Sequence, residues 1–297
     1  MSTTPESIVV IQLSILGKMN KIALFTVFYP GAEQYADEFI ESVTNQTYKD
    51  FDLLIVNDGY SLSNLQSRYP HLRIIEIEGN NTISGNRAIG INYAIQNSYD
   101  TIFLCDVDDY MTPNRVDVSI AALSDADIVV NDLDIVDANR NLIFKDYFQK
   151  TIKSETILDS KFIESKNIFG FSNTALRVSK LEEVKFPSDL RIVDWYYFTQ
   201  LLNDGLKAKF IPQSLTEYRQ HSGNMIGISS FTLDGFKDLL KLKIRHYSYF
   251  KDTYHGYADE LSEMLEIAEK SNEQLKEIIK KNTSETPYPL WWQNVKL

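Results

Sequence analysis

Apolar, strand-like runs alternate with helix-like segments through the first 105 residues of the chain. The strand-like runs are Ile22–Phe28, Phe51–Val56, Leu72–Ile77 and Thr101–Cys105. The segments between them have apolar residues at a helical period and are Glu33–Gln46, Leu62–Tyr69 and Ser84–Gln96, the last with Ser84 as its cap. This alternation predicts an α/β fold with a doubly wound, mostly parallel sheet. In such a sheet, ligands bind beyond the carboxyl ends of the strands.

Three carboxylates, Asp106, Asp108 and Asp109, follow the fourth predicted strand. They repel one another unless they face water or a cation, and an extended spacing puts Asp106 and Asp108 on the same side. One interpretation is a metal site, and the other is a solvated loop with helix-capping acids. A calcium loop of the EF-hand kind would need Gly and Glu where the chain has Met111 and Asp117. A phosphatase of the aspartyl-phosphate type would carry its acid after the first strand.

The composition narrows the choice of partners. With 297 residues, the chain is long enough for one large domain with an appendage. Its 30 Lys and Arg against 41 Asp and Glu give a net charge of −11, which disfavours nucleic acid as a partner and favours an anionic ligand bridged by a metal ion. No glycine-rich dinucleotide or P-loop motif is present, so bound phosphates must be held by metal and side chains. The single cysteine, Cys105, excludes an intramolecular disulfide and fits a reducing, cytoplasmic compartment.

After Pro113 the pattern predicts a helix to Leu123 and then further strands and a helix. These are the strands Ala126–Val136, Lys207–Ile211 and Leu215–Tyr218, and the aromatic-rich helix Arg191–Leu202, which opens near Asp194. A second Asp-x-Asp, Asp132 and Asp134, lies inside a predicted strand rather than at its end. We therefore expect a structural role for this second pair.

The chain divides into three predicted parts. Residues 1–20 form an N-terminal lead, in which the apolar run Ile8–Leu16 is too short for a membrane span and lacks the basic flank of a signal peptide. Residues 21–228 form the α/β domain. Residues 229–297 form a C-terminal helical extension of two amphipathic helices and an aromatic tail, Tyr288–Trp292. These helices and the tail either pack on the body or contact a partner, which would be another copy of the chain or the inner face of a membrane.

Four segments occur in an order and spacing that is specific when taken together. They are Thr47–Gly59, a strand that ends in Asn-Asp-Gly; Ser84–Gly90, with Asn-Arg-Ala-Ile-Gly; Phe103–Pro113, with Asp-x-Asp-Asp-x-x-x-Pro; and Tyr218–His221, with Tyr-Arg-x-His. Together they resemble the inverting GT-A nucleotide-sugar glycosyltransferases of family two, over about Lys21 to Asn224. The chain departs from the family pattern at Asn57 for an acid, Tyr60 for Ser, Ala88 for Asn, and Val193, where many members carry Glu.

The resemblance implies a Rossmann-like GT-A fold and a metal-dependent, inverting transfer of a sugar from a nucleoside diphosphate donor, a UDP-sugar, to a hydroxyl of a glycan or lipid-linked acceptor. It further implies that Asp58 accepts a hydrogen bond from the nucleobase beside Phe28 or Tyr29, and that His221 completes the metal or phosphate shell.

Residue chemistry adds the remaining assignments. Carboxylate oxygens suit Mn²⁺ or Mg²⁺, so Asp106 and Asp108 are the predicted ligands, with Asp108 the direct one. The donor diphosphate is predicted to contact Asp106 through the metal ion. It is also predicted to pair directly with Arg87 and Arg219. Asp194, crowded by aromatic residues, is the predicted general base. Each residue also has a structural interpretation: a turn for Asp58, a helix N-cap for Asp194, surface ion pairs for the arginines, and a surface or core position for His221.

Two other functions fit parts of the pattern. A sugar-phosphate nucleotidyltransferase would have a Gly-rich basic loop after the first strand, and residues 29–33 read Tyr-Pro-Gly-Ala-Glu instead. A non-catalytic, carbohydrate-binding protein on the same sheet would bind its ligand without turnover.

Overall fold

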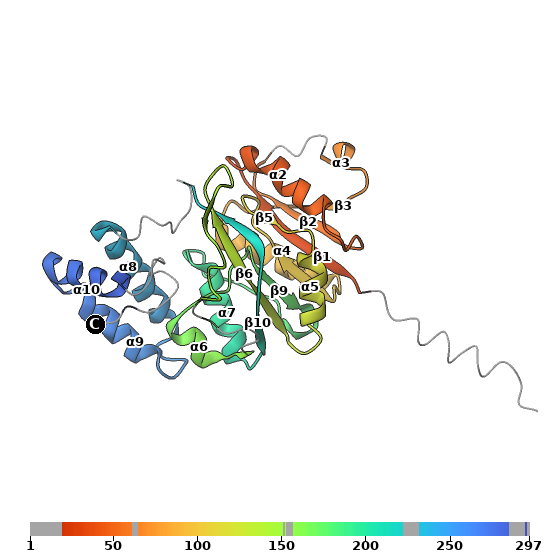
Figure 1. Cartoon of the computed structure of the whole chain (residues 1–297). Coiled ribbons are helices and arrows are strands. Elements are labelled where there is room, and N and C mark those ends of the chain that lie inside the picture. The colour runs from red at the N-terminus through yellow and green to blue at the C-terminus, as the bar shows by residue number, and fades with distance from the viewer. Residues whose placement is uncertain are drawn as a thin grey trace, which may run out of the picture.

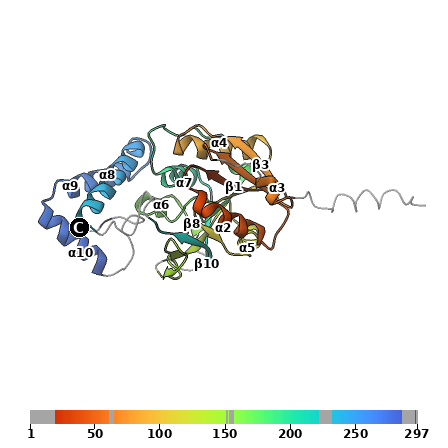
Figure 2. The same cartoon turned by 90° about the horizontal axis from the view of Figure 1, so that it is seen from above.

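The computed structural model describes residues 20–60, 65–150, 152, 157–221, 232–284 and 295. The predicted lead, except for Asn20, and the predicted aromatic tail therefore lie outside the described residues. Figure 1 shows a twisted central sheet with helices packed on both of its faces, and Figure 2 shows the same layers from above. The α/β class and the C-terminal helices predicted from the sequence are confirmed.

The first four strands form the parallel half of the sheet, in the order β3-β2-β1-β4. They are β1 (Ile22–Phe28), β2 (Asp52–Asn57), β3 (Arg73–Glu78) and β4 (Thr101–Leu104). The helices that connect them are α2 (Glu33–Thr44), α3 (Leu65–Arg68) and α4 (Ile83–Gln96). The cap of α4 is Thr82, whose side chain accepts from the backbone N–H of Gly85, so the prediction of Ser84 as the cap was wrong.

The second half of the sheet is mixed, which the sequence pattern did not predict. Strand β9 (Thr174–Arg177) lies between β4 and β6 (Ile128–Val136) and runs antiparallel to both. Strand β10 (Ala208–Arg219) runs parallel to β6 as one strand where two short ones were predicted, with register shifts between Ile211 and Thr216. The shorter strands, all antiparallel to their partners, are β5 (Tyr110–Met111), β7 (Leu142–Phe144) and β8 (Ile157–Leu158).

Alternate residues of the central strands supply two hydrophobic layers, as expected for a sheet covered on both faces. On β1, Leu24 and Phe28 pack with α2, α3 and α5 (Arg115–Ala122), whereas Phe25 and Val27 face α4, α6 (Ser160–Ser165) and α7 (Val193–Asn203). A short 3₁₀ turn, η1 (Val178–Lys180), follows β9. Helix α4 lies so close to β1 that a Cβ at Gly90 would meet the Phe25 ring at 2.1 Å. Glycine at this position therefore lets α4 pack directly against β1.

Three helices make up the described part of the C-terminal extension, where two were predicted. They are α8 (Leu233–Phe250), α9 (Tyr257–Ala268) and α10 (Asn272–Ser284), so the predicted second helix is divided into α9 and α10. They gather at one end of the molecule beside α6 and α7 (Figure 1, Figure 2). Phe236, Tyr247 and Phe250 of α8 belong to the same buried cluster as Phe25 of β1. Among the described residues, no helix has the length and apolar character that a membrane crossing requires.

Candidate active site

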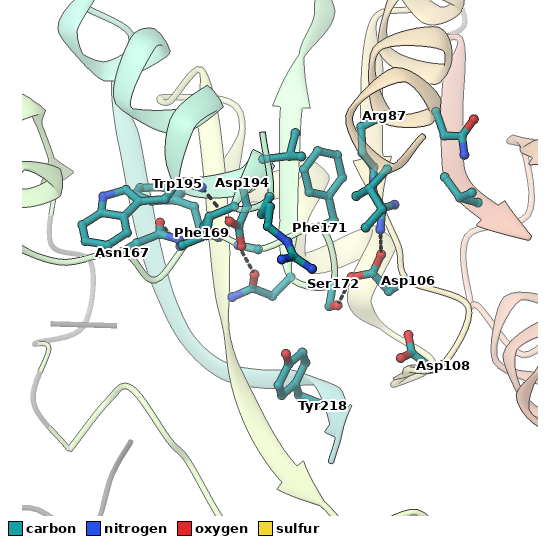
Figure 3. Close-up of a pocket in the computed structure, with 18 of the residues that line it drawn as sticks. Arg87, Asp106, Asp108, Asn167, Phe169, Phe171, Ser172, Asp194, Trp195 and Tyr218 are labelled. Atoms are coloured by element: carbon teal, nitrogen blue, oxygen red, sulfur yellow. Dashed lines mark hydrogen bonds and ion pairs between the residues drawn. The ribbon is translucent and has the colours of Figure 1, made fainter. Parts of the chain in front are cut away.

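A cavity of about 600 Å³ lies at the carboxyl ends of the parallel strands. Its walls come from the residues after β1, β2 and β4, from α4, from the loop that precedes β9, from the start of α7 and from β10. Figure 3 shows charged and aromatic side chains from these separate segments pointing toward one another. The volume lies within the range of small-molecule sites, and the position is the one predicted for ligand binding in this class of sheet.

Tyr29, Pro30 and Asp58 form one end of the cavity, where β1 and β2 end. Asp58 accepts from the backbone N–H of Asn81 at 2.8 Å, and the turn after it is held by Asn57, whose side-chain oxygen accepts from the N–H of Tyr60 at 2.8 Å. Burial, followed by the charges of Asp108 and Asp106, raises the pKa of Tyr29, which therefore keeps its phenolic proton. Asp58 therefore has the hydrogen bond of a turn residue and also lines the cavity.

Phe28 does not reach this cavity. Its ring is fully buried and packs edge-on against Phe39 at 6.1 Å and Tyr60 at 5.1 Å between ring centroids. The reason is strand alternation, since Phe28 points to the α2 face of the sheet. Of the two residues predicted to flank a base, only Tyr29 lines the cavity.

Arg87 of α4 forms an ion pair with Asp106, the first acid after β4. Asp106 Oδ1 accepts from Arg87 Nη2, and Asp106 Oδ2 accepts from Ser172 Oγ at 2.8 Å. The Arg87 guanidinium lies 4.3 Å from the centre of the Phe171 ring, and its buried Nη1 has no hydrogen-bond partner among the described residues. Both oxygens of Asp106 are thus engaged by protein donors, whereas one nitrogen of Arg87 keeps an unused hydrogen-bonding capacity next to the cavity.

Asp108 has a different partner from Asp106. Its Oδ2 lies 2.9 Å from His221 Nε2, and the His221 ring lies against Tyr35 with 5.0 Å between ring centroids. The backbone turns at Val107 and Asp108, so the extended spacing that would put Asp106 and Asp108 on the same side does not occur. The structure therefore brings together Asp108 and His221, but it pairs Asp106 with Arg87.

This arrangement bears on the predicted cation. The part of the chain that the structure describes contains no group of three or more His, Cys, Asp and Glu side chains placed to hold a metal ion. However, hard cations such as Mg²⁺ are often held by one or two carboxylates together with substrate phosphates. Asp108 lines the cavity with an imidazole beside it. This donor set fits a cation that a diphosphate ligand helps to hold.

Arg219 lies behind the cavity and is not among the residues that line it. It is 3% exposed, pairs with Glu38 of α2, and donates from Nη1 to the carbonyl of Ala138 at 2.9 Å. Its backbone N–H donates to Asp109 Oδ1 at 2.7 Å, and Asp109 is buried as well. The structure does not bring Arg219 to the position predicted for a phosphate contact, because its guanidinium is held by Glu38 and Ala138 outside the cavity lining.

Asp194 lies in the first turn of α7 and lines the cavity at a distance from Asp108 (Figure 3). Its Oδ1 accepts from the backbone N–H of Trp195 at 2.6 Å. The N-cap of α7 is Ile192, so the capping interpretation of Asp194 was wrong. Burial raises the pKa of Asp194 to about 6, with the charge of Asp106 adding to the rise, while the Trp195 N–H and Arg87 oppose it. Such a carboxylate is ionised at neutral pH and is a stronger base than an ordinary aspartate.

The second Asp-x-Asp is structural in its contacts. Asp132 is fully buried and accepts from the backbone N–H groups of Leu133, Phe148 and Gln149. Asp134 accepts from the N–H of Asp146 at 2.9 Å. Both carboxylates hold the chain after β7 against β6.

Several cavity residues had no predicted role. The loop of residues 167–173 contributes Phe169, Phe171 and Ser172, and β10 contributes Tyr218. Burial and the neighbouring carboxylates raise the pKa of Tyr218, so its hydroxyl stays protonated and is a donor. In the sequence, the loop was marked only by its Gly and Asn residues, and Tyr218 only by its place in the Tyr-Arg-x-His segment.

Comparison with known proteins identifies the family. Residues 24–185, more than half of the chain, match the family model described as Glycosyl transferase family 2. The chain belongs to this family. It is therefore a glycosyltransferase, and its family resemblance is confirmed.

Individual relatives agree with this assignment. The chain is 36% identical over 102 residues to an uncharacterized glycosyltransferase, YwdF, of Bacillus subtilis, a match that covers 33% of this chain and 37% of that protein. It is 24% identical over 218 residues to an uncharacterized glycosyltransferase, MJ1057, of Methanocaldococcus jannaschii, covering 69% of this chain and 73% of the relative.

Solved structures share the GT-A fold. S. aureus TarS 1-349 in complex with UDP superposes with a TM-score of 0.58 at 14% identity, covering 82% of this chain and 70% of that one. The mannosyltransferase PcManGT from Pyrobaculum calidifontis in complex with GDP-Man and Mn²⁺ gives a TM-score of 0.56 at 12% identity, covering 89% and 74%. At these identities the likeness establishes the fold alone.

Proposed function

We propose that the chain is a divalent-cation-dependent, inverting glycosyltransferase that moves a sugar from a nucleoside diphosphate donor, a UDP-sugar, to a hydroxyl of a glycan or lipid-linked acceptor. The observation that carries the proposal is the division of one cavity into two ends. Asp58, Arg87 and Asp108 lie toward the strand ends β1, β2 and β4, and Asp194 lies at the start of α7. Two solved neighbours contain UDP and GDP-Man, which supports a nucleotide-sugar donor.

The donor end offers contacts for each part of a nucleoside diphosphate. Tyr29 and Asp58 supply a ring and an acceptor for a base, in keeping with the role that the family resemblance implies for Asp58. The unpartnered Nη1 of Arg87 is a buried cationic donor for a phosphate oxygen. The Phe171 ring and the Asp106 carboxylate hold the Arg87 side chain in place before a ligand arrives.

Asp108 and His221 are the residues that would hold a divalent cation, and Mn²⁺ in the PcManGT complex supports this choice. A bound cation of this kind would neutralise the negative charge that develops on the departing diphosphate. Asp106, with both oxygens engaged, would instead fix Arg87 and the loop of Ser172 beside the same phosphates.

Asp194 would take the proton from the acceptor hydroxyl as that oxygen attacks the anomeric carbon. A single displacement inverts the configuration there, because the acceptor enters on the side opposite the leaving diphosphate. The separation of Asp194 from Asp108 in Figure 3 suits such an arrangement. The raised pKa of about 6 makes Asp194 a stronger base than an ordinary aspartate, and it is still low enough for Asp194 to be ionised at neutral pH.

A paired experiment tests this proposal. Thermal unfolding in the presence of UDP and GDP, each with and without Mn²⁺, should show stabilisation by UDP that depends on Mn²⁺, because a ligand that binds only the folded state raises its stability. The same preparation should release UDP from a UDP-sugar more quickly when an acceptor glycan is added. A larger shift with GDP would overturn the assignment of the donor, and equal shifts with and without Mn²⁺ would overturn the assignment of the cation.

A further inference from the structure

We propose that His246 of α8 is a positioning residue for Asp194, acting through the ring of Trp195, so that the C-terminal helices form part of the acceptor side of the active site. The inference rests on the proposed role of Asp194 as the base. It concerns a contact between the α/β domain and the C-terminal extension, which the sequence analysis predicted as separate parts of the chain.

Trp195 joins these parts. Its backbone N–H donates to Asp194 Oδ1 at 2.6 Å, and its indole Nε1 donates to the carbonyl of Ile163 on α6 at 3.1 Å. The residue lines the cavity next to Asp194 but is only 2% exposed. The buried indole thus anchors the residue whose peptide N–H holds the Asp194 carboxylate.

Helix α8 fixes the face of that indole. The His246 ring stacks on Trp195 with 4.1 Å between ring centroids and 21° between the planes. Lys243 Nζ, one turn earlier, lies 4.9 Å from the centre of the same ring. Tyr247 meets the ring edge-on at 5.7 Å. These three side chains of one helix confine Trp195, and all three are buried.

The contact of His246 with Trp195 is made by the face of the ring. Both ring nitrogens of His246 are buried without a hydrogen-bond partner among the described residues. Burial, and then the neighbouring Lys243, lower its pKa well below the ordinary value, so the ring is neutral. A phenylalanine ring should therefore stack on Trp195 as His246 does. His246→Phe is thus a conservative variant that should keep the positioning role.

Helix α8 is itself tied to the body on both sides of this stack. The Tyr247 hydroxyl donates to the carbonyl of Glu164 on α6 at 2.9 Å, and Arg245 forms an ion pair with Asp189, close to the start of α7. The position of the His246 ring is thus set by α6 and by the segment before α7. This geometry makes α8 a rigid support for Trp195.

The test uses four variants of the full chain: His246→Ala, His246→Phe, Phe236→Ala and Asp194→Asn. Phe236 is fully buried on α8 and has no ring contact with Trp195 among the described residues, so Phe236→Ala controls for a cavity in the same helix. Each variant is measured for its Tm, for the affinity for UDP with Mn²⁺, and for kcat of sugar transfer as a function of pH.

We expect His246→Ala to keep its donor affinity and to lose between about tenfold and 10²-fold in kcat, the range that follows from a misplacement of about 1 Å at a reacting group. The acidic limb of its kcat profile should also move to higher pH, because Trp195 supplies the N–H that lowers the pKa of Asp194. The other groups that affect this pKa are Asp106 and Arg87, with Tyr218 facing the same carboxylate, and none of these is altered. His246→Phe should behave like the wild type.

The outcomes separate this inference from the proposed function. A Phe236→Ala variant with a similar fall in Tm should keep a normal kcat and an unmoved acidic limb. If His246→Ala matches Phe236→Ala in both readouts while Asp194→Asn is inactive, the positioning role is overturned and the base assignment stands. If Asp194→Asn transfers sugar at the normal rate, the base assignment fails, and the positioning role fails with it.

Discussion

Arg87 and Asp106 neutralise each other inside the cavity, and the pair joins helix α4 to the loop after β4. Each side chain is mostly buried, with 16% of Arg87 and 25% of Asp106 exposed. Because a buried charge without a partner is costly, the pair fixes the positions of both segments. One guanidinium nitrogen, Nη1, has no hydrogen-bond partner among the described residues.

The first prediction concerns this nitrogen. Arg87→Met keeps much of the side-chain volume but removes the charge-assisted hydrogen bond to the donor phosphate, which typically contributes about 1.5 to 3 kcal/mol. The affinity for UDP with Mn²⁺ should therefore fall between about tenfold and 10²-fold, as measured by titration calorimetry. The control is Arg68→Met, since Arg68 pairs with Asp37 on the surface and should leave the affinity unchanged. An unchanged affinity in Arg87→Met would remove Arg87 from the donor site.

The second prediction concerns the cation. Asp108→Asn removes the carboxylate that lies 2.9 Å from His221, so UDP should no longer stabilise the protein more strongly in the presence of Mn²⁺. The Tm without ligand should hold or rise slightly, because one of three neighbouring acids is neutralised. Asp125→Asn, on the surface beside Lys209, is the matched control. A full Mn²⁺-dependent shift in Asp108→Asn would show that the cation is held elsewhere.

The sequence could predict the parallel half of the sheet because its strands are compact apolar runs that alternate with helices α2, α3 and α4. It could not predict the antiparallel direction of β9, since a four-residue strand has the same composition in either direction and its direction is set by β4 and β6. The break between α9 and α10 was missed for a related reason: one apolar stripe runs through both helices.

The cavity residues likewise divide into those that a local sequence pattern predicts and those that depend on packing between distant segments. Tyr29, Asp58, Asp106 and Asp108 follow strand ends, and strand ends of a parallel sheet converge, so their common location was predictable. The hydrogen bond from Ser172 to Asp106 and the stack of His246 on Trp195 depend on a loop and on helix packing, which leave no local pattern. Arg219 illustrates the opposite case, because its motif suggested a ligand contact, but the side chain pairs with Glu38 of helix α2, which is distant in the sequence.

The third prediction concerns the boundary expected after residue 228. Phe236, Tyr247 and Phe250 of α8 share a buried cluster with the body of the protein. A chain truncated after residue 228 should therefore expose a large apolar surface and aggregate, as light scattering and size-exclusion chromatography would show. A soluble monomer that still binds UDP would instead indicate that the C-terminal helices are a separate unit, available for contact with a membrane or another copy.

The fourth prediction follows from the pKa of Asp194. A general base acts in its ionised form, so kcat should be constant above the pKa of about 6 and should fall as the pH drops below it. An ordinary aspartate, with a pKa of about 4, would keep kcat constant down to about pH 5. A kcat profile for transfer between pH 4.5 and 8, together with the pH dependence of donor affinity, distinguishes the two cases.

The last prediction isolates acceptor chemistry from donor binding. Asp194→Asn preserves the size of the side chain and an oxygen that can accept from the Trp195 N–H, but it cannot take up the proton of the acceptor hydroxyl. Transfer should therefore fall by about 10² to 10⁴ in kcat, with donor affinity retained, because removal of a general base affects the transition state and not the ground state. Since Ile192 is the N-cap of α7, loss of a cap cannot account for such a fall. Near-normal transfer would return the search for the base to Asp109, Asp132 and Asp134, of which Asp109 and Asp132 are buried and hydrogen-bonded to backbone N–H groups.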